Sequence, residues 1–201
     1  MGGCNLSCSW CDSAFTWDTA RYDLSREVGY WPVGEVVETA LACRPGLVVI
    51  SGGEPLLQQN SLAWTQLLDS LAGNEIGVET NGTHAPSEAT LNRVSWITVS
   101  PKLAHSGDPA WARINGDALV SWGQCAQNFD IDFSFAVRDI SDVTTVTTLV
   151  TIHGLPPERV WIVPEGTTAA TSLDRLNDVS DAALNAGFNL STRLSALVGG
   201  R

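Results

Sequence analysis

The chain has 201 residues, of which 44% are hydrophobic, and its 22 acidic and 11 basic residues give a net charge of −11. This length allows one domain with a substantial core, which we expect to span residues 1–201. The negative charge disfavours nucleic acid and anionic membranes as partners. The sequence has neither a leader pattern nor an apolar run of about 18 residues, so we expect a cytoplasmic protein with reduced thiols.

Residues 2–17, GGCNLSCSWCDSAFTW, form a loop that holds three of the five cysteines. After this loop, the spacing of apolar residues alternates between helical and extended periods. Helices are expected over residues 33–43, 61–72, 87–93, 118–127, 142–153 and 169–186. Buried strands are expected over residues 47–50, 76–79, 96–99, 131–137 and 160–163, followed by an extended stretch over 188–197.

This alternation predicts an α/β fold with a parallel sheet and helices packed outside it. The pattern alone does not distinguish an incomplete barrel from an open doubly wound sheet. In both architectures, function gathers at the carboxyl ends of the strands. The segments SGGEP, TNGT, SPKLAHSGD and PEGTT each follow an expected strand, so we expect them to share one rim.

The cysteines at positions 4, 8 and 11 have the spacing C-x3-C-x2-C, which indicates a metal site because thiolates are soft ligands. A structural zinc site usually has four ligands in two pairs, and the sequence offers no second pair. Three closely spaced thiols also cannot all pair as disulfides. An iron–sulfur cluster with one open iron is the leading interpretation, and zinc is the alternative. Cys43 and Cys125 match no motif and are expected to be buried core thiols.

The cysteine loop resembles that of the radical S-adenosylmethionine (SAM) enzymes. More narrowly, GGCNLSCSWCD, SGGEP, ETNGT, SPKLA and VWIVPEGT occur in an order that resembles the 7-carboxy-7-deazaguanine synthase family. The resemblance implies an incomplete, abbreviated (β/α) barrel with parallel strands. It implies a carbon–nitrogen lyase that converts 6-carboxy-5,6,7,8-tetrahydropterin to 7-carboxy-7-deazaguanine and ammonia in deazapurine or queuosine biosynthesis.

The resemblance also implies a flavodoxin- or ferredoxin-type reductant as a partner, and it leaves a homodimer open. Another radical SAM activity, such as that of an activase, is one alternative function. The VPEGT and SPKLA segments weigh against it. The other alternative is an iron–sulfur or zinc protein without turnover.

The resemblance implies that Cys4, Cys8 and Cys11 hold a 4Fe–4S cluster, that Ser13 binds Mg²⁺ and that Ser51 contacts the substrate. It assigns no catalytic residue. The implied contacts to SAM are Trp10, Cys11, Asp12, Gly52, Gly53, Glu54, Glu79, Asn81, Ser100, Pro101, Lys102, Val163, Pro164, Glu165 and Gly166. Their chemistry fits, because glycines permit close backbone approach, carboxylates and amides bond hydroxyls, and lysine pairs with a carboxylate.

Two segments depart from the family pattern. The family's N-terminal strand, its Gln-Gly-Glu-Gly loop and an arginine before the cluster have no counterpart ahead of Gly2. The segment over residues 193–198, RLSALV, also differs from the family's C-terminal segment. We therefore expect part of the family's pterin pocket to be missing from this chain.

Overall fold

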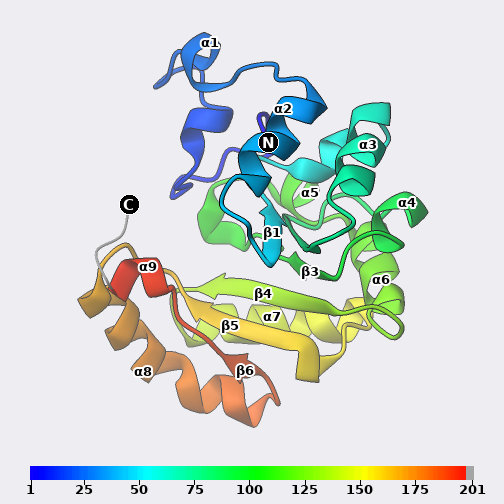
Figure 1. Cartoon of the computed structure of the whole chain (residues 1–201). Helices are drawn as coiled ribbons and strands as arrows, with labels where there is room; N and C mark the ends of the chain where they lie inside the picture. Colours follow the sequence, from blue (N-terminus) through cyan, green and yellow to red (C-terminus); the bar gives the residue numbers. More distant parts are fainter. Residues whose placement is uncertain (198–201) are drawn as a thin grey trace.

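A computed structural model describes residues 1–197 and shows a parallel sheet with the order β1-β2-β3-β4-β5-β6 (Figure 1). The strands are β1 (Leu47–Ile50), β2 (Glu75–Thr80), β3 (Trp96–Val99), β4 (Ile131–Val137), β5 (Val160–Pro164) and β6 (Asn189–Leu190). The helices are α1 (Leu24–Glu27), α2 (Val33–Leu41), α3 (Leu62–Ser70), α4 (Glu88–Leu91), α5 (Ala110–Arg113), α6 (Gly116–Cys125), α7 (Ile140–His153), α8 (Ala169–Asn185) and α9 (Leu194–Leu197).

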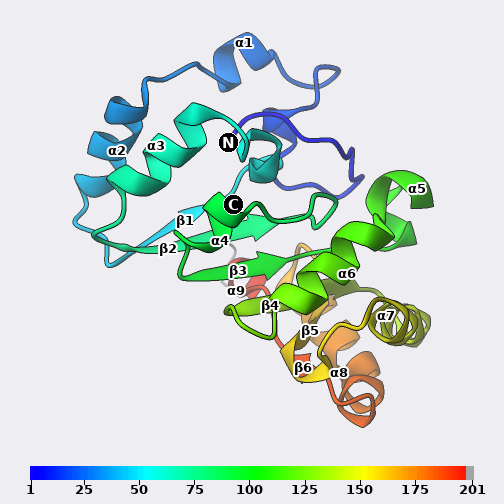
Figure 2. The same cartoon turned by 90° about the vertical axis from the view of Figure 1, so that its right-hand side faces the viewer.

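The sequential strand order decides between the two architectures that the sequence left open. A doubly wound sheet reverses its strand order at a switch point, whereas here every strand pairs in parallel with its neighbour in the chain. Within residues 1–197, β1 pairs only with β2 and β6 pairs only with β5. The two edge strands do not pair with each other, so the sheet is open. The predicted incomplete barrel is therefore confirmed. Figure 2 shows α6, α7 and α8 packed along the outer side of the strands.

The strands alternate between a helix-facing side and a concave side. In β4, Ile131, Phe133 and Phe135 are fully buried in the core. Ser134 and Ala136 alternate with these residues along the strand and point the other way. β3 and β5 have the same alternation of burial. Small and polar side chains are thereby brought to the concave side, where they can line a cavity.

The predicted strands over residues 47–50, 96–99 and 131–137 are confirmed at these boundaries, although two descriptions were wrong. β1 is not a buried strand, because it lies at the sheet edge and leaves Leu47 40% and Val49 43% exposed. The expected extended stretch over 188–197 holds only the short β6 before the chain turns into α9. Helices α1 and α5 were not predicted, since one turn of four residues is too short to show helical periodicity.

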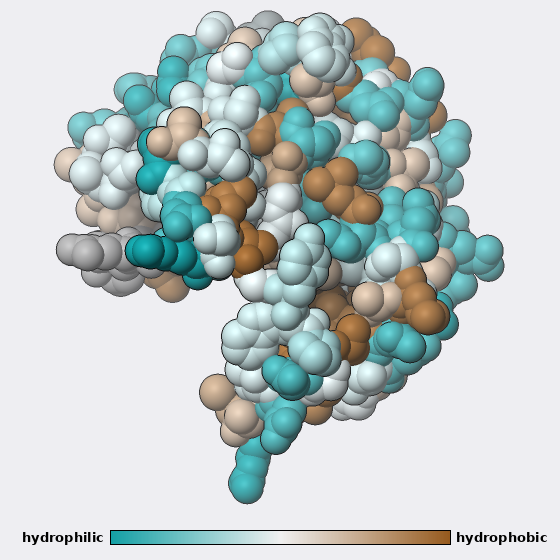
Figure 3. Space-filling view, turned by 90° about the horizontal axis from the view of Figure 1, so that it is seen from above, coloured by the Kyte–Doolittle hydropathy of each residue, from teal (hydrophilic) through white to brown (hydrophobic). Residues whose placement is uncertain are grey.

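The surface carries scattered hydrophobic residues. On the face seen in Figure 3, they lie as separate patches among hydrophilic ones. Cys43 is exposed, so its prediction as a core thiol was wrong, while Cys125 is half-buried against the core. Among residues 1–197, each helix is too short or too polar to cross a membrane.

Candidate active site

A cavity of about 410 Å³ lies on the concave side of the sheet, towards the carboxyl ends of the strands. Figure 1 shows β4 and β5 pointing towards the side on which the N-terminal loop lies. The cavity is lined by Cys4, Leu6, Cys8, Trp10, Cys11, Asp12, Ser13, Trp17, Ser51, Gly52, Gly53, Glu79, Thr80, Asn81, Thr98, Ser100, Lys102, Ser134, Ala136, Val163, Glu165 and Arg193. The structure thus brings together the cysteine loop and the segments that follow β1, β2, β3 and β5.

Four residues that the sequence placed at the site do not line this cavity: Glu54, Pro101, Pro164 and Gly166. Pro101 and Pro164 are buried. Gly166 packs against α8, because a Cβ atom at this position would lie 2.8 Å from the Oγ atom of Ser172. These residues shape the loops behind the cavity.

The donor set at the cavity suits an iron–sulfur cluster. The thiols of Cys4, Cys8 and Cys11 are free. The backbone N–H of Leu6 donates to Sγ of Cys4, and the indole N–H of Trp17 donates to Sγ of Cys11, both at 3.4 Å. Such N–H donors stabilise thiolate charge in a metal-bound state.

A single metal ion and an iron–sulfur cluster require different arrangements of the three thiols. Among residues 1–197, no three His, Cys, Asp or Glu side chains converge closely enough to hold one ion. A tetrahedral zinc site needs all its sulfurs about 2.3 Å from one atom, whereas a 4Fe–4S cluster binds each thiolate through a different iron. Burial raises the pKa of Cys8 to about 12, so this thiol stays protonated at neutral pH until metal displaces the proton.

The loop that carries the cysteines is anchored by the segments after β2 and β3. The Asp108 carboxylate accepts from the backbone N–H of Ser7 at 3.0 Å and from its hydroxyl at 2.8 Å. The Asn81 amide donates to the side-chain oxygen of Asn5 at 2.9 Å. These contacts hold the backbone around the cysteines while the sulfurs face the cavity.

Gly52 and Gly53 allow the N-terminal segment to approach the turn after β1. The N–H of Gly53 donates to the carbonyl of Met1 at 2.9 Å. A Cβ atom at Gly53 would lie 1.9 Å from the carbonyl oxygen of Gly3, and Gly52 adopts φ of +129°. From the sequence, the space beside Gly53 was expected to hold the cofactor. In the structure, the backbone of Gly3 occupies this space.

Lys102 is the only lysine in the sequence. Its Nζ donates to Oγ of Ser100 at 2.8 Å and lies 5.7 Å from the ring centroid of Trp10. Burial lowers the pKa of Lys102, and the nearby Glu54 carboxylate opposes that shift. The cavity therefore contains a basic side chain beside the three cysteines.

Three carboxylates at the cavity already have partners. Ser51 donates to Glu79 at 2.9 Å, and Asp12 forms an ion pair with Arg193. Glu165 pairs with Arg138 at 3.3 Å and with Arg175 of α8. Arg193 and Asp108 were not predicted, because their roles depend on contacts between distant segments. Trp17 was not predicted either, although its contact with Cys11 lies within the cysteine loop.

Glu54 supports the cavity from behind. Its side chain is fully buried, and its carboxylate accepts from the Thr80 hydroxyl at 2.7 Å, the Asn81 N–H at 2.7 Å and the Leu56 N–H at 3.0 Å. The carboxylate thus joins the turn after β1 to the end of β2.

Replacing Glu54 by glutamine should lower the free energy of unfolding by about 2–3 kcal/mol, because the new amide NH₂ would face a hydrogen-bond donor. The matched control is Glu75→Gln on the exposed start of β2, for which we expect less than about 0.5 kcal/mol. Urea unfolding followed by circular dichroism measures both values. Equal stability of the two variants would show that the Glu54 contacts do not brace the site.

Comparisons with known proteins agree with this geometry. The family model described as the Radical SAM superfamily matches residues 1–101. Two solved structures, Streptococcus suis SuiB and SuiB bound to S-adenosylmethionine, each superpose with a TM-score of 0.57 at 15% sequence identity. The superpositions cover 96% and 94% of this chain and 47% and 48% of the SuiB chains, and they support the fold.

Curated relatives narrow the assignment. The 7-carboxy-7-deazaguanine synthase of Pyrobaculum aerophilum is 30% identical over 202 residues, covering 100% of this chain and 84% of the relative. The synthase of the same name from Halobacterium salinarum is 34% identical, and the alignment covers 96% of this chain and 78% of the relative. The synthase from Hyperthermus butylicus is 35% identical, and the alignment covers 98% of this chain and 82% of the relative.

The chain has an open parallel α/β sheet with three cysteines at one cavity, and its residues 1–101 match the family model. It is therefore an enzyme of the radical SAM superfamily, whose cofactors are a 4Fe–4S cluster and SAM. Within that superfamily, the chain belongs to the 7-carboxy-7-deazaguanine synthase family.

Proposed function

We propose that this protein is a carbon–nitrogen lyase that converts 6-carboxy-5,6,7,8-tetrahydropterin to 7-carboxy-7-deazaguanine with release of ammonia. The observation that carries the proposal is the gathering of three free cysteines and Lys102 around one cavity, in a chain of this family. The product would supply deazapurine biosynthesis.

When bound, the reduced cluster and SAM supply the radical that removes hydrogen from the substrate. Cys4, Cys8 and Cys11 would hold the cluster. Lys102, with the Ser100 hydroxyl, faces the cavity as the group that would bind the methionyl carboxylate of SAM. A lysine side chain that lines the cavity suits this task, because it can form charge-assisted hydrogen bonds with a carboxylate.

The remaining SAM contacts would come from the strand ends. Glu79 near the end of β2 and Asn81 just after it line the cavity, and their carboxylate and amide groups suit ribose hydroxyls. Val163 near the end of β5 and Glu165 just after it would border the adenine. The cavity walls would also exclude water from the reacting atoms.

The pterin and Mg²⁺ would bind near the cavity opening. Ser13 and Asp12 present oxygen atoms there, as a hard cation requires, and Ser51 lines the same cavity. Arg193 is a cation at this edge, available to the substrate carboxylate in place of Asp12. The reductant would be a flavodoxin- or ferredoxin-type protein.

Replacing Lys102 by methionine should weaken SAM binding about tenfold or more, because a charge-assisted hydrogen bond contributes about 1.5–3 kcal/mol. Lys102→Arg keeps the positive charge and should retain part of the affinity. Equilibrium binding of SAM to the reconstituted variants gives both dissociation constants, with iron content confirming that each variant holds its cluster. An unchanged constant for Lys102→Met would exclude the carboxylate role.

The experiment that tests the proposed function is product analysis by mass spectrometry. The full-length, reconstituted protein is incubated without oxygen with reductant, SAM and the pterin, with and without Mg²⁺. We expect 7-carboxy-7-deazaguanine only when SAM and the pterin are both present, with more product in the presence of Mg²⁺. Formation of 5′-deoxyadenosine without any deazapurine would keep the radical SAM class and reject the substrate.

A further inference from the structure

His105 lies outside the residues that line the cavity, yet it contacts one that does. The indole N–H of Trp10 donates to Nδ1 of His105 at 3.0 Å, and the two ring centroids are 5.7 Å apart with an interplanar angle of 32°. Trp10 immediately precedes Cys11. His105 therefore binds the cysteine loop at Trp10, the residue next to Cys11.

The surroundings of His105 fix its tautomer. Because Nδ1 accepts a hydrogen bond from Trp10, the proton of the neutral ring must sit on Nε2. Nε2 lies 3.0 Å from the carbonyl oxygen of Ala136 and 3.5 Å from the Asp142 carboxylate, and both are acceptors. The imidazole side chain is only 7% exposed, so water does not replace these partners.

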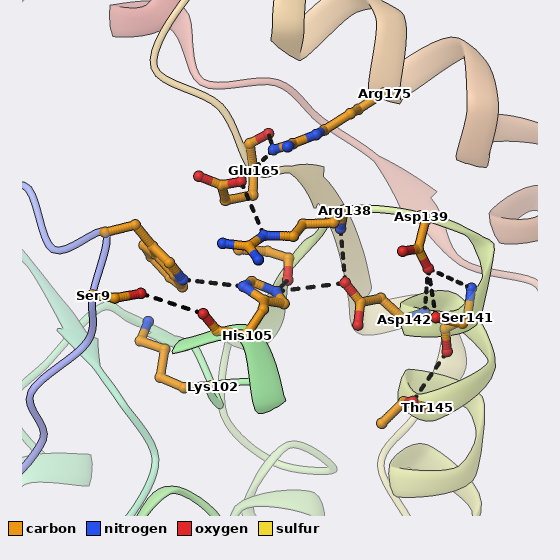
Figure 4. Close-up of polar contacts among 12 residues, drawn as sticks. Ser9, Lys102, His105, Arg138, Asp139, Ser141, Asp142, Thr145, Glu165 and Arg175 are labelled. Atoms are coloured by element: carbon orange, nitrogen blue, oxygen red, sulfur yellow. Dashed lines mark hydrogen bonds and ion pairs between the residues drawn. The ribbon is translucent and has the colours of Figure 1, made fainter. Parts of the chain in front are cut away.

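The far side of this network leads to the other rim of the cavity. Asp142, in the first turn of α7, also accepts from the backbone N–H of Arg138 at 2.8 Å. The Arg138 guanidinium pairs with Glu165, which lines the cavity (Figure 4). His105 thus joins the cysteine loop to the rim formed after β4 and β5.

Trp10 also contacts Lys102. Its ring faces Nζ of Lys102 at 5.7 Å, within the range of a cation–π contact. Lys102 and His105 come from the same segment after β3, so the Trp10 ring contacts two side chains of that segment. Without its hydrogen bond to His105, the Trp10 ring can rotate away from the Lys102 ammonium.

We propose that His105 is a positioning residue: as the Nε2-protonated imidazole, it fixes Trp10 and, through Trp10, the Lys102 ammonium that meets SAM. The SAM contact rests on the proposed function, but the positioning of Lys102 does not. His105 does not touch the reacting atoms, and its influence passes through the Trp10 ring.

Two substitutions separate the two ring nitrogens. Asparagine places its side-chain oxygen near the former Nδ1 and keeps an acceptor for Trp10, whereas glutamine places its amide near the former Nε2 and keeps a donor for Ala136. We expect His105→Asn to bind SAM close to the wild-type affinity. We expect His105→Gln to weaken SAM binding about tenfold, as the loss of one buried hydrogen bond allows.

A readout independent of SAM uses the single lysine. In protein labelled with ¹³C-lysine, all lysine signals come from Lys102, and the Trp10 ring current should shift its Hε protons upfield. The spectrum is recorded on the full chain before cluster reconstitution. We expect the shift to persist in His105→Asn and to be lost in His105→Gln.

Trp10→Phe provides the second test, because it removes the N–H donor and keeps an aromatic wall. It should weaken SAM binding as much as His105→Gln does, and the double variant should be no weaker than either one. Additive losses, or a Lys102 shift that survives in His105→Gln, would overturn the positioning role. Failure of deazapurine formation with these results intact would affect only the proposed substrate.

Discussion

Replacing Cys8 by alanine is expected to reduce iron from about four atoms per chain to almost none after anaerobic reconstitution. Cys8 is one of only three thiols at the cavity among the described residues, and its loss leaves two protein ligands for a cluster that needs three. Iron analysis and the visible absorption of the cluster measure the outcome.

The chain offers a matched control for Cys8. Cys43 is exposed and lies outside the cavity, so Cys43→Ala should retain the full iron content. If Cys8→Ala kept its cluster, or if both variants lost iron equally, the assignment of the cluster ligands would be wrong. Cofactor cleavage should follow the iron content in each variant.

Replacing Gly53 by alanine is the second change with a large expected effect. The new Cβ atom would lie 1.9 Å from the carbonyl oxygen of Gly3 and would push the cysteine loop off the turn after β1. We expect a loss of about 3 kcal/mol in the free energy of unfolding. We also expect most of the iron to be lost, since Gly3 directly precedes Cys4.

Gly73→Ala is the control, because a Cβ atom there meets no atom within 4 Å and the residue is exposed. Its stability should stay within about 1 kcal/mol of the wild type. Thermal unfolding and iron analysis of the two variants distinguish a local collision from a general glycine effect. Normal iron content in Gly53→Ala would mean that the close approach is not needed to hold the loop.

The sequence predicted most of the sheet because apolar, β-branched runs bounded by turns carry strong local signals. The strand over residues 131–137 is an example, with Ile131, Phe133 and Phe135 alternating with smaller side chains. The polar segments after the strands were also predicted to share one rim, and the parallel order brings them to one cavity.

Other features depend on contacts that no local pattern contains. His105 lies in the segment SPKLAHSGD and was assigned no role, yet its ring accepts a hydrogen bond from Trp10, which is 95 positions away. Asp108 and Arg193 reach the cysteine loop across 101 and 181 positions. The edge position of β1, which exposes Val49, likewise follows from strand order and not from the strand's own residues.

The most direct test of the central claim is cleavage of SAM by the reconstituted, reduced protein in the absence of oxygen. The account predicts a brown protein with about four irons per chain, an electron paramagnetic resonance signal that changes when SAM is added, and formation of 5′-deoxyadenosine that Cys8→Ala abolishes. A colourless protein with one zinc per chain and no 5′-deoxyadenosine under these conditions would contradict it.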